Sequence, residues 1–380
     1  MNDSLPPPSV IANQHIDPAG FDAQARHFLQ IHMGSDTRRW IGNVGATVTA
    51  LEAGGIAFPA TENHTAQRDA WVTSPVSTYY HYALEELDRL HKPWLAAALR
   101  PLVHALGHWM QRARMDDCVC LNNWLVSTNS YPDVPLSVVF ELVDAARQRW
   151  PQQAIWLRSL NAVQNPLWMR ALVQAGALLI PSREVFLFDA IDILATRHAD
   201  LKKDFAWLRR HPLQRLQPDT MTGNDYTRAA DLYGLLYLQK YSRLNPDYSP
   251  ALLQRWHRER LLELHGLRDA DGRLGAVVGM LRFGSVITSP IVGYDTARPQ
   301  REGLYRLLAA TVLDQARQRR CMVNLSAGVG RFKLQRGGQP VIEYSAVIAD
   351  HLPASQRRPL HWLARLAQHV GVPILQGFRT

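Results

Sequence analysis

Residues 286–350, VITSPIVGYDTARPQREGLYRLLAATVLDQARQRRCMVNLSAGVGRFKLQRGGQPVIEYSAVIAD, change their local pattern in an order that decides the fold. The apolar run at 286–294 contains Val, Ile and Thr and predicts a strand, and 302–319 carries apolar residues at helical spacing. After it come a short β-rich run at 321–326, a second short helix at 329–335, a Gly-Gly break and an alternating run at 340–349. The stretch therefore predicts strand, helix, strand, helix, strand.

The loop between the first strand and the first helix has the composition of an anion site. It reads Gln300, Arg301, Glu302, Gly303, Leu304, Tyr305. A helix N-terminus offers free backbone N–H groups, and a glycine lets a phosphate approach closely. The alternative is an ordinary helix start, with Glu302 and Gly303 in the first turn interacting with the helix dipole.

A second stretch, residues 117–189, repeats the same order of elements. It predicts strands at 117–128, 154–160 and 178–189, with helices at 136–149 and 166–175 between them. The octamer LVDAARQR at 142–149 matches VLDQARQR at 312–319 in five of eight positions, including Asp144 with Asp314. A shared order of elements with shared letters indicates a duplicated domain, because solenoid repeats are only about 20–50 residues long.

The rest of the chain divides around these two copies. We expect helices at 21–29, 40–52, 80–90, 94–112, 191–211, 225–240 and 250–262, a strand at 71–79 and a hairpin about the Asp-Gly turn at 269–272. The predicted class is α/β with a mixed sheet, in two tandem domains. The predicted segments are a loose N-terminus at 1–35, a non-catalytic domain at 36–190, a helical linker at 191–223 and a catalytic domain at 224–380.

Composition limits the partners. The 380 residues carry a formal net charge of +9, which favours an acidic partner such as a CoA pyrophosphate, an acyl carrier protein or tRNA, although the arginines are spread over many predicted helices. Cys118, Cys120 and Cys321 lie in apolar runs and are expected to be buried thiols. Neither a signal peptide nor an apolar run of about 18 residues is visible, so we expect a cytoplasmic protein without a membrane span.

Two motifs suggest other chemistry, and we set both aside. His104 and His108 are four residues apart on one predicted helix face, but they lack the glutamate and third ligand of a zinc enzyme, so no metal is expected. Residues 324–328, NLSAG, resemble a nucleophile elbow, but they begin with Asn and no Asp and His follow in the required order.

The second half as a whole resembles the GNAT acyltransferase superfamily. Residues 300–305 look like a degenerate pyrophosphate loop, and helix, helix, hairpin and then residues 286–350 give the element order of a complete GNAT domain. From about 38 to 370 the chain resembles the double-GNAT architecture of CelD-like and Fem-type transferases, in which the second half is catalytic. The resemblance implies that an acyl thioester lies between two splayed strands, with its pyrophosphate at the N-terminus of the following helix.

The sequence departs from that family at two places. Tyr305 stands where the loop usually ends in Gly or Ala, and Phe332 stands where a tyrosine usually precedes the retained Lys333. In many GNAT enzymes a tyrosine near this helix is thought to protonate the departing thiolate. The resemblance therefore leaves Tyr344, Tyr305 and Tyr294 as substitutes.

The resemblance also implies where the other functional residues lie. Polar residues at strand ends should provide the proton acceptor and the oxyanion donors, and the loop after the first helix of the second half should recognise the acceptor. The catalytic candidates are Asn324, Ser326, Glu343, Tyr344, Lys333 and Asp295. The substrate-binding candidates are Tyr241, Ser242, Asn245, Tyr294 and Arg336.

Three functions are compatible with these residues. The first is an N-acyltransferase that moves an acyl group from acyl-CoA or a carrier-protein thioester to an amine of a small metabolite or peptide by direct attack. The second keeps the fold and takes aminoacyl-tRNA as the donor, as Fem-type enzymes do. The third is an inactive double-GNAT protein that binds a partner in a biosynthetic assembly, a reading that Phe332 favours.

Overall fold

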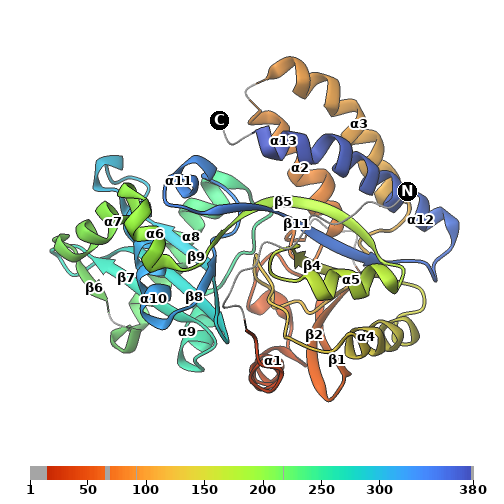
Figure 1. Ribbon diagram of the computed structural model, residues 1–380, viewed down its shortest axis with the longest axis horizontal. Helices are drawn as coiled ribbons and strands as arrows, with labels where there is room; N and C mark the ends of the chain where they lie inside the picture. Colours follow the sequence, from red (N-terminus) through yellow and green to blue (C-terminus); the bar gives the residue numbers. More distant parts are fainter. Residues whose placement is uncertain (1–14, 65–68, 91, 217, 378–380) are drawn as a thin grey trace.

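All strands of the described chain join in one mixed sheet. The computed structural model describes residues 15–64, 69–90, 92–216 and 218–377. Over these residues, eleven strands pair in the order β1-β2-β3-β4-β11-β5-β10-β9-β8-β7-β6 (Figure 1). The strands are β1 (Thr47–Ala53), β2 (Ile56–Asn63), β3 (Cys118–Leu121), β4 (Ala154–Leu160), β5 (Leu178–Phe188), β6 (Gln214–Leu216), β7 (Glu263–Arg268), β8 (Leu274–Phe283), β9 (Val286–Tyr294), β10 (Met322–Asn324) and β11 (Gln339–Ile348).

Helices cover both faces of this sheet (Figure 1). The α-helices are α1 (Pro18–His32), α2 (Tyr82–Asp88), α3 (Pro93–Arg112), α4 (Leu136–Arg149), α5 (Pro166–Gln174), α6 (Ile191–Arg197), α7 (Ala199–Arg210), α8 (Gly223–Tyr233), α9 (Pro250–Arg258), α10 (Leu304–Arg319), α11 (Gly330–Leu334), α12 (Ala354–Leu366) and α13 (Val372–Gly377). Short 3-10 or π turns are η1 (Thr37–Arg39), η2 (Ser77–His81), η3 (Pro218–Thr220), η4 (Gly234–Tyr241), η5 (Gln300–Glu302) and η6 (Ala367–Gly371).

The predicted duplication of element order is confirmed. The first copy is β3-α4-β4-α5-β5 and the second is β9-α10-β10-α11-β11. The helix predicted at 136–149 and the strands predicted at 154–160 and 286–294 have the predicted bounds. The hairpin at 269–272 is also present, between β7 and β8.

The two copies exchange their closing strands. β11, from the second copy, lies between β4 and β5 of the first copy and pairs antiparallel with both. β5, from the first copy, lies between β11 and β10 of the second. The largest buried apolar cluster likewise contains residues of both halves, for example Trp124 and Phe283, whose ring centroids are 4.6 Å apart. The segments 36–190 and 224–380 thus share a sheet and a core, and the division between them remains a prediction.

Alternation along the central strands sends side chains to two cores. In β3, Cys118 and Cys120 point to the cluster beneath α3 and α12, whereas Val119 and Leu121 point to the cluster beneath α1 and α4. The three cysteines are free and buried, as predicted. Within the described residues, no helix is both long and apolar enough to span a bilayer.

Three predictions in the first half are wrong. The strand predicted at 117–128 ends at Leu121, as β3, because Asn122 takes a left-handed φ of 53° and its side chain donates to the Ser130 carbonyl. Residues 40–52 were expected to be a helix, but residues from Thr47 on form β1, because a β-rich alternating run meets the Gly54-Gly55 turn and pairs with the unpredicted β2. Residues 71–79 do not form a strand. There the Asp116 carboxylate accepts hydrogen bonds from the Ser74 hydroxyl and the Val76 N–H and turns the chain into η2.

The N-terminal segment contributes to the core from Ile16 onward. The helix predicted at 21–29 is present as α1, and its Phe21 and Phe28 rings pack on Trp124 at centroid distances of 5.4 and 5.2 Å. The Pro-rich part of the expected loose segment lies outside the described residues. The segment expected as a helical linker, 191–223, holds α6, α7, η3 and the edge strand β6.

Candidate active site

Strands β9 and β10 pair over three residues and then part. Met322 to Asn324 pair in parallel with Val286 to Thr288, after which β10 ends while β9 continues to Tyr294. The hydroxyl of Thr288 is buried and has no hydrogen-bond partner within the described residues. This is the divergence in which the family resemblance predicts a thioester.

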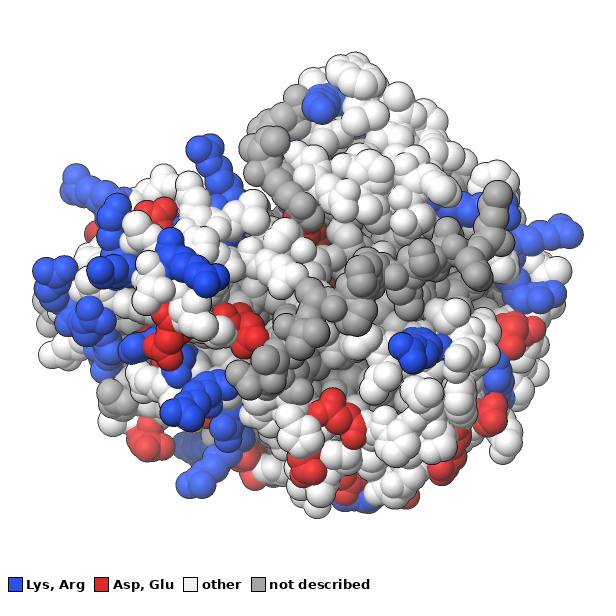
Figure 2. Space-filling view, viewed as in Figure 1, with Lys and Arg blue, Asp and Glu red and all other residues white. Residues whose placement is uncertain are grey.

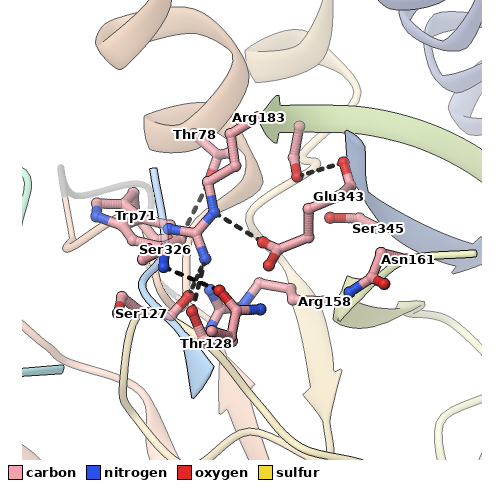
Figure 3. Close-up of polar contacts among 12 residues, drawn as sticks. Trp71, Thr78, Ser127, Thr128, Arg158, Asn161, Arg183, Ser326, Glu343 and Ser345 are labelled. Atoms are coloured by element: carbon pink, nitrogen blue, oxygen red, sulfur yellow. Dashed lines mark hydrogen bonds and ion pairs between the residues drawn. The ribbon is translucent and has the colours of Figure 1, made fainter. Parts of the chain in front are cut away.

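A buried ion pair lies close to the end of β10 (Figure 3). Arg183 of β5 and Glu343 of β11 are direct cross-strand partners, and the Arg183 Nε lies 2.7 Å from the Glu343 Oε1. Arg183 Nη2 also donates to the Ser127 carbonyl at 2.5 Å and to Thr128 Oγ1 at 3.1 Å. Glu343 is only 2% exposed, and its Oε2 has no partner among the residues that the structure describes. One oxygen of this carboxylate is therefore still able to accept a hydrogen bond.

A second arginine joins this cluster. The guanidinium carbons of Arg158 and Arg183 each lie 5.0 Å from the centroid of the Trp71 ring. Arg158 Nη2 donates to the Asn123 Oδ1 and the Val126 carbonyl, whereas its Nε is buried and has no partner in the described chain. Burial lowers the pKa of Arg158, and the positive charge of Arg183 lowers it further. Two guanidinium groups beside one carboxylate leave one excess positive charge.

The predicted acceptor loop supports this cluster through Trp71. The Trp71 Nε1 donates to Asn245 Oδ1 at 3.1 Å, and the Trp71 N–H donates to the Leu244 carbonyl at 2.9 Å. Ser242 and Asn245 are both buried, and the Ser242 Oγ accepts the Leu244 N–H at 3.1 Å. These two candidates therefore shape the turn that holds the aromatic platform of the arginines.

Lys333 organises the loop that follows β10. Its buried ammonium donates to the carbonyls of Leu325, Ser326 and Ala327 at 2.8, 3.0 and 2.9 Å. Burial lowers the pKa of Lys333 to about 7, and the charge of Arg183 adds to the decrease. All three ammonium protons are used within the protein, so the lysine holds main chain in this structure.

Asn324 and Ser326 lie in the same loop. Asn324 donates through Nδ2 to the Gln164 Oε1, and its Oδ1 accepts the Ser326 N–H, both at 2.9 Å. Ser326 has the left-handed φ of 57°. Figure 3 places it next to Ser127 and the Arg183 guanidinium. The structure thus brings Asn324, Ser326 and Glu343 into one neighbourhood.

Tyrosines gather where the strands diverge. Burial raises the pKa of Tyr305, and the phenols of Tyr237, Tyr241 and Tyr294 raise it further. Tyr305 also packs edge-on against Phe332, with the ring centroids 5.2 Å apart. A tyrosine hydroxyl is therefore available beside the position from which the family's tyrosine is missing.

The predicted phosphate loop forms η5 and the start of α10. Gln300, Arg301 and Glu302 make a short 3-10 turn, and Gly303 takes a left-handed φ of 57° before the helix begins at Leu304. Within the described residues, the N–H groups of Leu304, Tyr305 and Arg306 have no acceptor, as expected for a first helical turn. The Trp207 ring of α7 closes the loop on one side, since a Cβ on Gly303 would lie 2.4 Å from it.

Arg336 contributes charge to the same helix end. The buried Asp204 carboxylate of α7 binds both Arg306 and Arg336, and the Arg336 Nε lies 2.5 Å from the Asp204 Oδ2. Arg306 also stacks on Trp207, its guanidinium carbon 4.7 Å from the ring centroid. Two guanidiniums sharing one carboxylate leave a positive excess beside the open amides of α10.

Two catalytic candidates lie apart from this neighbourhood. Asp295 pairs with Arg228 at 2.8 Å and lines a surface pocket of about 570 Å³ that also contains Asp269, Arg273 and Arg298. Tyr344 packs against the largest apolar cluster, to which both halves contribute. The structure therefore gathers part of the predicted set and leaves these two outside it.

Sequence reasoning did not single out Arg183 or Trp71. Arg183 stands inside the apolar run of β5. A charge in such a run requires a partner, because an unpaired buried ion is strongly destabilising. That signal was visible in the sequence, whereas the partner, from a strand 160 positions later in the chain, was not.

Comparison with solved structures supports the fold. The chain is similar to FemX, at 10% identity and a TM-score of 0.51, with 87% of this chain and 96% of that chain covered. It is also similar to L-PGS from Bacillus licheniformis, at 12% identity and a TM-score of 0.50, with 93% of this chain and 99% of that chain covered. No protein-family model and no curated protein matches the sequence. The architecture is therefore double-GNAT-like, with a mixed α/β sheet, as predicted.

Proposed function

We propose that this protein is a transferase that moves an acyl group from a thioester, on coenzyme A or a carrier protein, to an amine. The observation that carries the proposal is the buried Arg183–Glu343 pair next to the end of β10, where β9 and β10 stop pairing. A donor lying along the diverging strands would present its carbonyl carbon near this pair.

Two groups are suited to the proton transfers. The acceptor reacts as the neutral amine after its ammonium has released one proton to water, and the free Oε2 of Glu343 accepts the second proton from nitrogen, directly or through a water, as the new C–N bond forms. That proton returns through water to the Tyr305 phenolate once the thiol has left. The Tyr305 phenol remains protonated because its pKa is raised, and it donates its proton to sulfur as the C–S bond breaks. Lys333 keeps the loop at 325–327 in place and takes no proton in this scheme.

The donor's phosphates fit the N-terminus of α10. The loop of Gln300, Arg301, Glu302 and Gly303 leads into three unoccupied N–H groups. The shared Asp204 pairing of Arg306 and Arg336 adds net positive charge there. A diphosphate is a suitable ligand for amides and cations arranged in this way.

The cluster also favours an acceptor amine that carries a carboxylate. The unpartnered Nε of Arg158 is a donor, and the excess positive charge of the cluster equals one monoanion. Glu343 Oε2 would bind the ammonium of the same molecule. A zwitterion, such as an α-amino acid, supplies both groups.

The test is incubation of the full chain with a panel of acyl-CoAs and two acceptor sets, the amino acids and their amides, with mass spectrometry of free CoA and of acylated product. We expect CoA release that depends on acceptor, with the free acids preferred. Product formed from the amides alone would contradict the requirement for a carboxylate on the acceptor, but it would still support the transferase proposal. If the protein neither bound a thioester nor released CoA, the proposal of an acyltransferase would be wrong.

A charge-reversal variant tests the donor site. Arg301→Glu replaces an exposed cation by an acid beside the α10 amides and should weaken CoA binding about fivefold to tenfold, the size of a two-unit charge change at a helix N-terminus. Arg170→Glu makes the same change on the exposed side of α5 in the first copy and should leave binding unchanged. Equal loss in both variants would indicate a general charge effect.

Aminoacyl-tRNA is the second candidate donor, favoured by the fold likeness to FemX. It predicts salt-sensitive binding of charged tRNA together with no thermal stabilisation by CoA. The third candidate is an inactive binding protein. It predicts that genes encoding Glu343→Gln or Tyr305→Phe still fully complement a deletion strain. Assaying both ligands and both variants in parallel separates the three functions.

A further inference from the structure

Helix α3 is apolar on the side that faces solvent. Its exposed residues recur every three or four positions, the spacing of one helix face. Trp94 is 71% exposed and Leu102 45%. The members of this stripe are Trp94, Ala97, Ala98, Pro101, Leu102 and Ala105. Because Leu106 and Met110 already bury the other side of α3, the stripe is a surplus apolar surface that folding does not explain.

Helix α12 presents its outer side in the same direction. Leu360 and Leu363 of α12 belong to the same buried cluster as Leu106 and Met110 of α3, over one face of β4 and β11. The two helices therefore lie on the same face of the sheet, and their exposed sides point away from it (Figure 1). Trp362, 57% exposed, is on the outer side of α12.

All charged residues of α3, α12 and the segments beside them are basic, whereas the neighbouring helix α2 carries Glu85, Glu86 and Asp88. Residues 92–115 and 351–377 contain no Asp or Glu. Their cations are Lys92, Arg100, Arg112, Arg114, Arg357, Arg358 and Arg365. Of these, only Arg100 and Arg114 pair with an acid in the described chain, Asp88 and Asp117 respectively. Figure 2 shows the lobe that Figure 1 assigns to α3, α12 and α13 as largely uncharged, with Lys or Arg at its margins.

We propose that the outer sides of α3 and α12 dock this protein on an anionic lipid bilayer. Trp and Leu side chains on the outside of a helix enter the headgroup region, and neighbouring Arg and Lys bind anionic headgroups while their stems remain in the apolar layer. The attachment is peripheral, since the helices use only their outer sides. It is independent of the transferase proposal.

A second copy of the chain is a poorer occupant of this surface. A symmetric dimer through the outer sides of α3 and α12 would bring two segments without acids into contact, with the unpaired arginines of one copy facing those of the other. Such like charges repel when they are close and shielded from water. An anionic lipid surface suits the outer sides of α3 and α12, because it buries apolar side chains and supplies negative charge.

The experiment is co-sedimentation of the full chain with two kinds of vesicle, phosphatidylcholine alone and an equal mixture of phosphatidylcholine and phosphatidylglycerol. We expect binding to the mixed vesicles, weakened by salt, and little binding to phosphatidylcholine. Trp94→Ser combined with Leu102→Ser should reduce the vesicle-bound fraction at least about tenfold, because it removes the inserted side chains. Replacing Arg357, Arg358 and Arg365 by Gln should remove the salt-sensitive part of vesicle binding.

The control changes exposed apolar residues elsewhere. Leu167 and Val173 of α5 are 53% and 47% exposed, so Leu167→Ser with Val173→Ser matches the test variant without touching α3 or α12. Binding that is unchanged in the α3 variant, or lost equally in the α5 variant, would overturn the proposal. A concentration-dependent dimer in lipid-free solution that Trp94→Ser abolishes would assign the surface to a second copy instead.

Discussion

The two copies of the repeated unit differ most at the N-terminus of their first helix, where an anion would bind. Before α4 the position aligned with Gly303 is Asp133, whose carboxylate accepts the Ile16 N–H at 3.0 Å and contacts His15 Nδ1 at 2.8 Å. In α10 it is Gly303, followed by free N–H groups. The helix bodies meanwhile retain the same ion pair, Asp144 with Arg147 and Asp314 with Arg317. Duplication has therefore kept the scaffold in both copies, but it has placed an acid before the helix in one copy and a glycine in the other.

The loops before the second helix differ in a similar way. In the first copy the Asn161 side chain accepts the N–H groups of Val163 and Gln164 at 3.2 and 2.8 Å, which is a neutral turn. In the second copy the Lys333 ammonium collects three carbonyls. A neutral amide and a buried cation thus do the same structural work, and only the second depends on pH.

The largest expected loss of stability comes from breaking the buried ion pair that links the two copies. Arg183→Gln removes the partner of Glu343 across the exchanged strands β5 and β11. It should lower the free energy of unfolding by about 3–5 kcal/mol, the cost of leaving one charge of a buried pair uncompensated. Urea denaturation followed by tryptophan fluorescence measures the change.

A surface pair between the copies provides the control. Arg147 contacts Asp350 at 2.7 Å, but Asp350 is 48% exposed, so Arg147→Gln should cost no more than about 1 kcal/mol. If Arg183→Gln cost as little as Arg147→Gln, the buried pair would not be what holds the exchanged strands together.

The second prediction compares the two loops directly. Lys333→Met leaves three carbonyls without their donor and should cost about 2–3 kcal/mol, whereas Asn161→Ala loses a neutral turn and should cost about 1 kcal/mol. Both values come from chemical denaturation at a fixed pH. The reverse order would indicate that the first-copy loop is the more tightly organised.

The third prediction concerns pH. Burial lowers the pKa of Lys333 from 10.5 to about 7, so between these values the unfolded chain binds more protons at this site than the folded chain does. The contribution of Lys333 to stability should therefore rise with pH across that window and be constant above it. The unfolding free energy of the wild type minus that of Lys333→Met isolates this contribution. A difference that stays level from pH 7 to pH 10 would contradict it.

Much of the fold was predictable because it depends on local pattern. The periodicity of α4, β4 and β9 and the Asp-Gly turn between β7 and β8 are properties of adjacent residues. The hairpin of β1 and β2 was missed although Gly54 and Gly55 indicated it. The exchange of β5 and β11 could not be predicted, because two antiparallel strands of similar composition can pair within a copy or between copies.

The candidate site was predictable to the same limited degree. The alternation expected for Glu343 and Tyr344 is interrupted by a register shift between them, and Ser326 lies beyond the end of β10, where Asn324 contacts it through a loop hydrogen bond and not through strand spacing. The partner of Glu343 comes from the other copy, and Trp71 comes from a segment that was expected to be a strand. Contacts made by tertiary packing alone leave no periodic trace in the sequence.

The smallest predicted effect separates backbone strain from close packing at the open helix end. Gly303→Ala must hold a side chain at a φ of 57° and push it against Trp207, whereas Gly272→Ala, at a φ of 76°, meets no atom within 4 Å. Both variants should lose about 1 kcal/mol to the left-handed backbone, and Gly303→Ala about 1 kcal/mol more to the contact. Trp207→Leu should remove that excess when combined with Gly303→Ala. Thermal unfolding of Gly303→Ala, Gly272→Ala, Trp207→Leu and the double variant measures the backbone and contact contributions. Equal losses for the two glycines would mean that Trp207 moves aside without cost, so that the α10 amides are less enclosed than the contact implies.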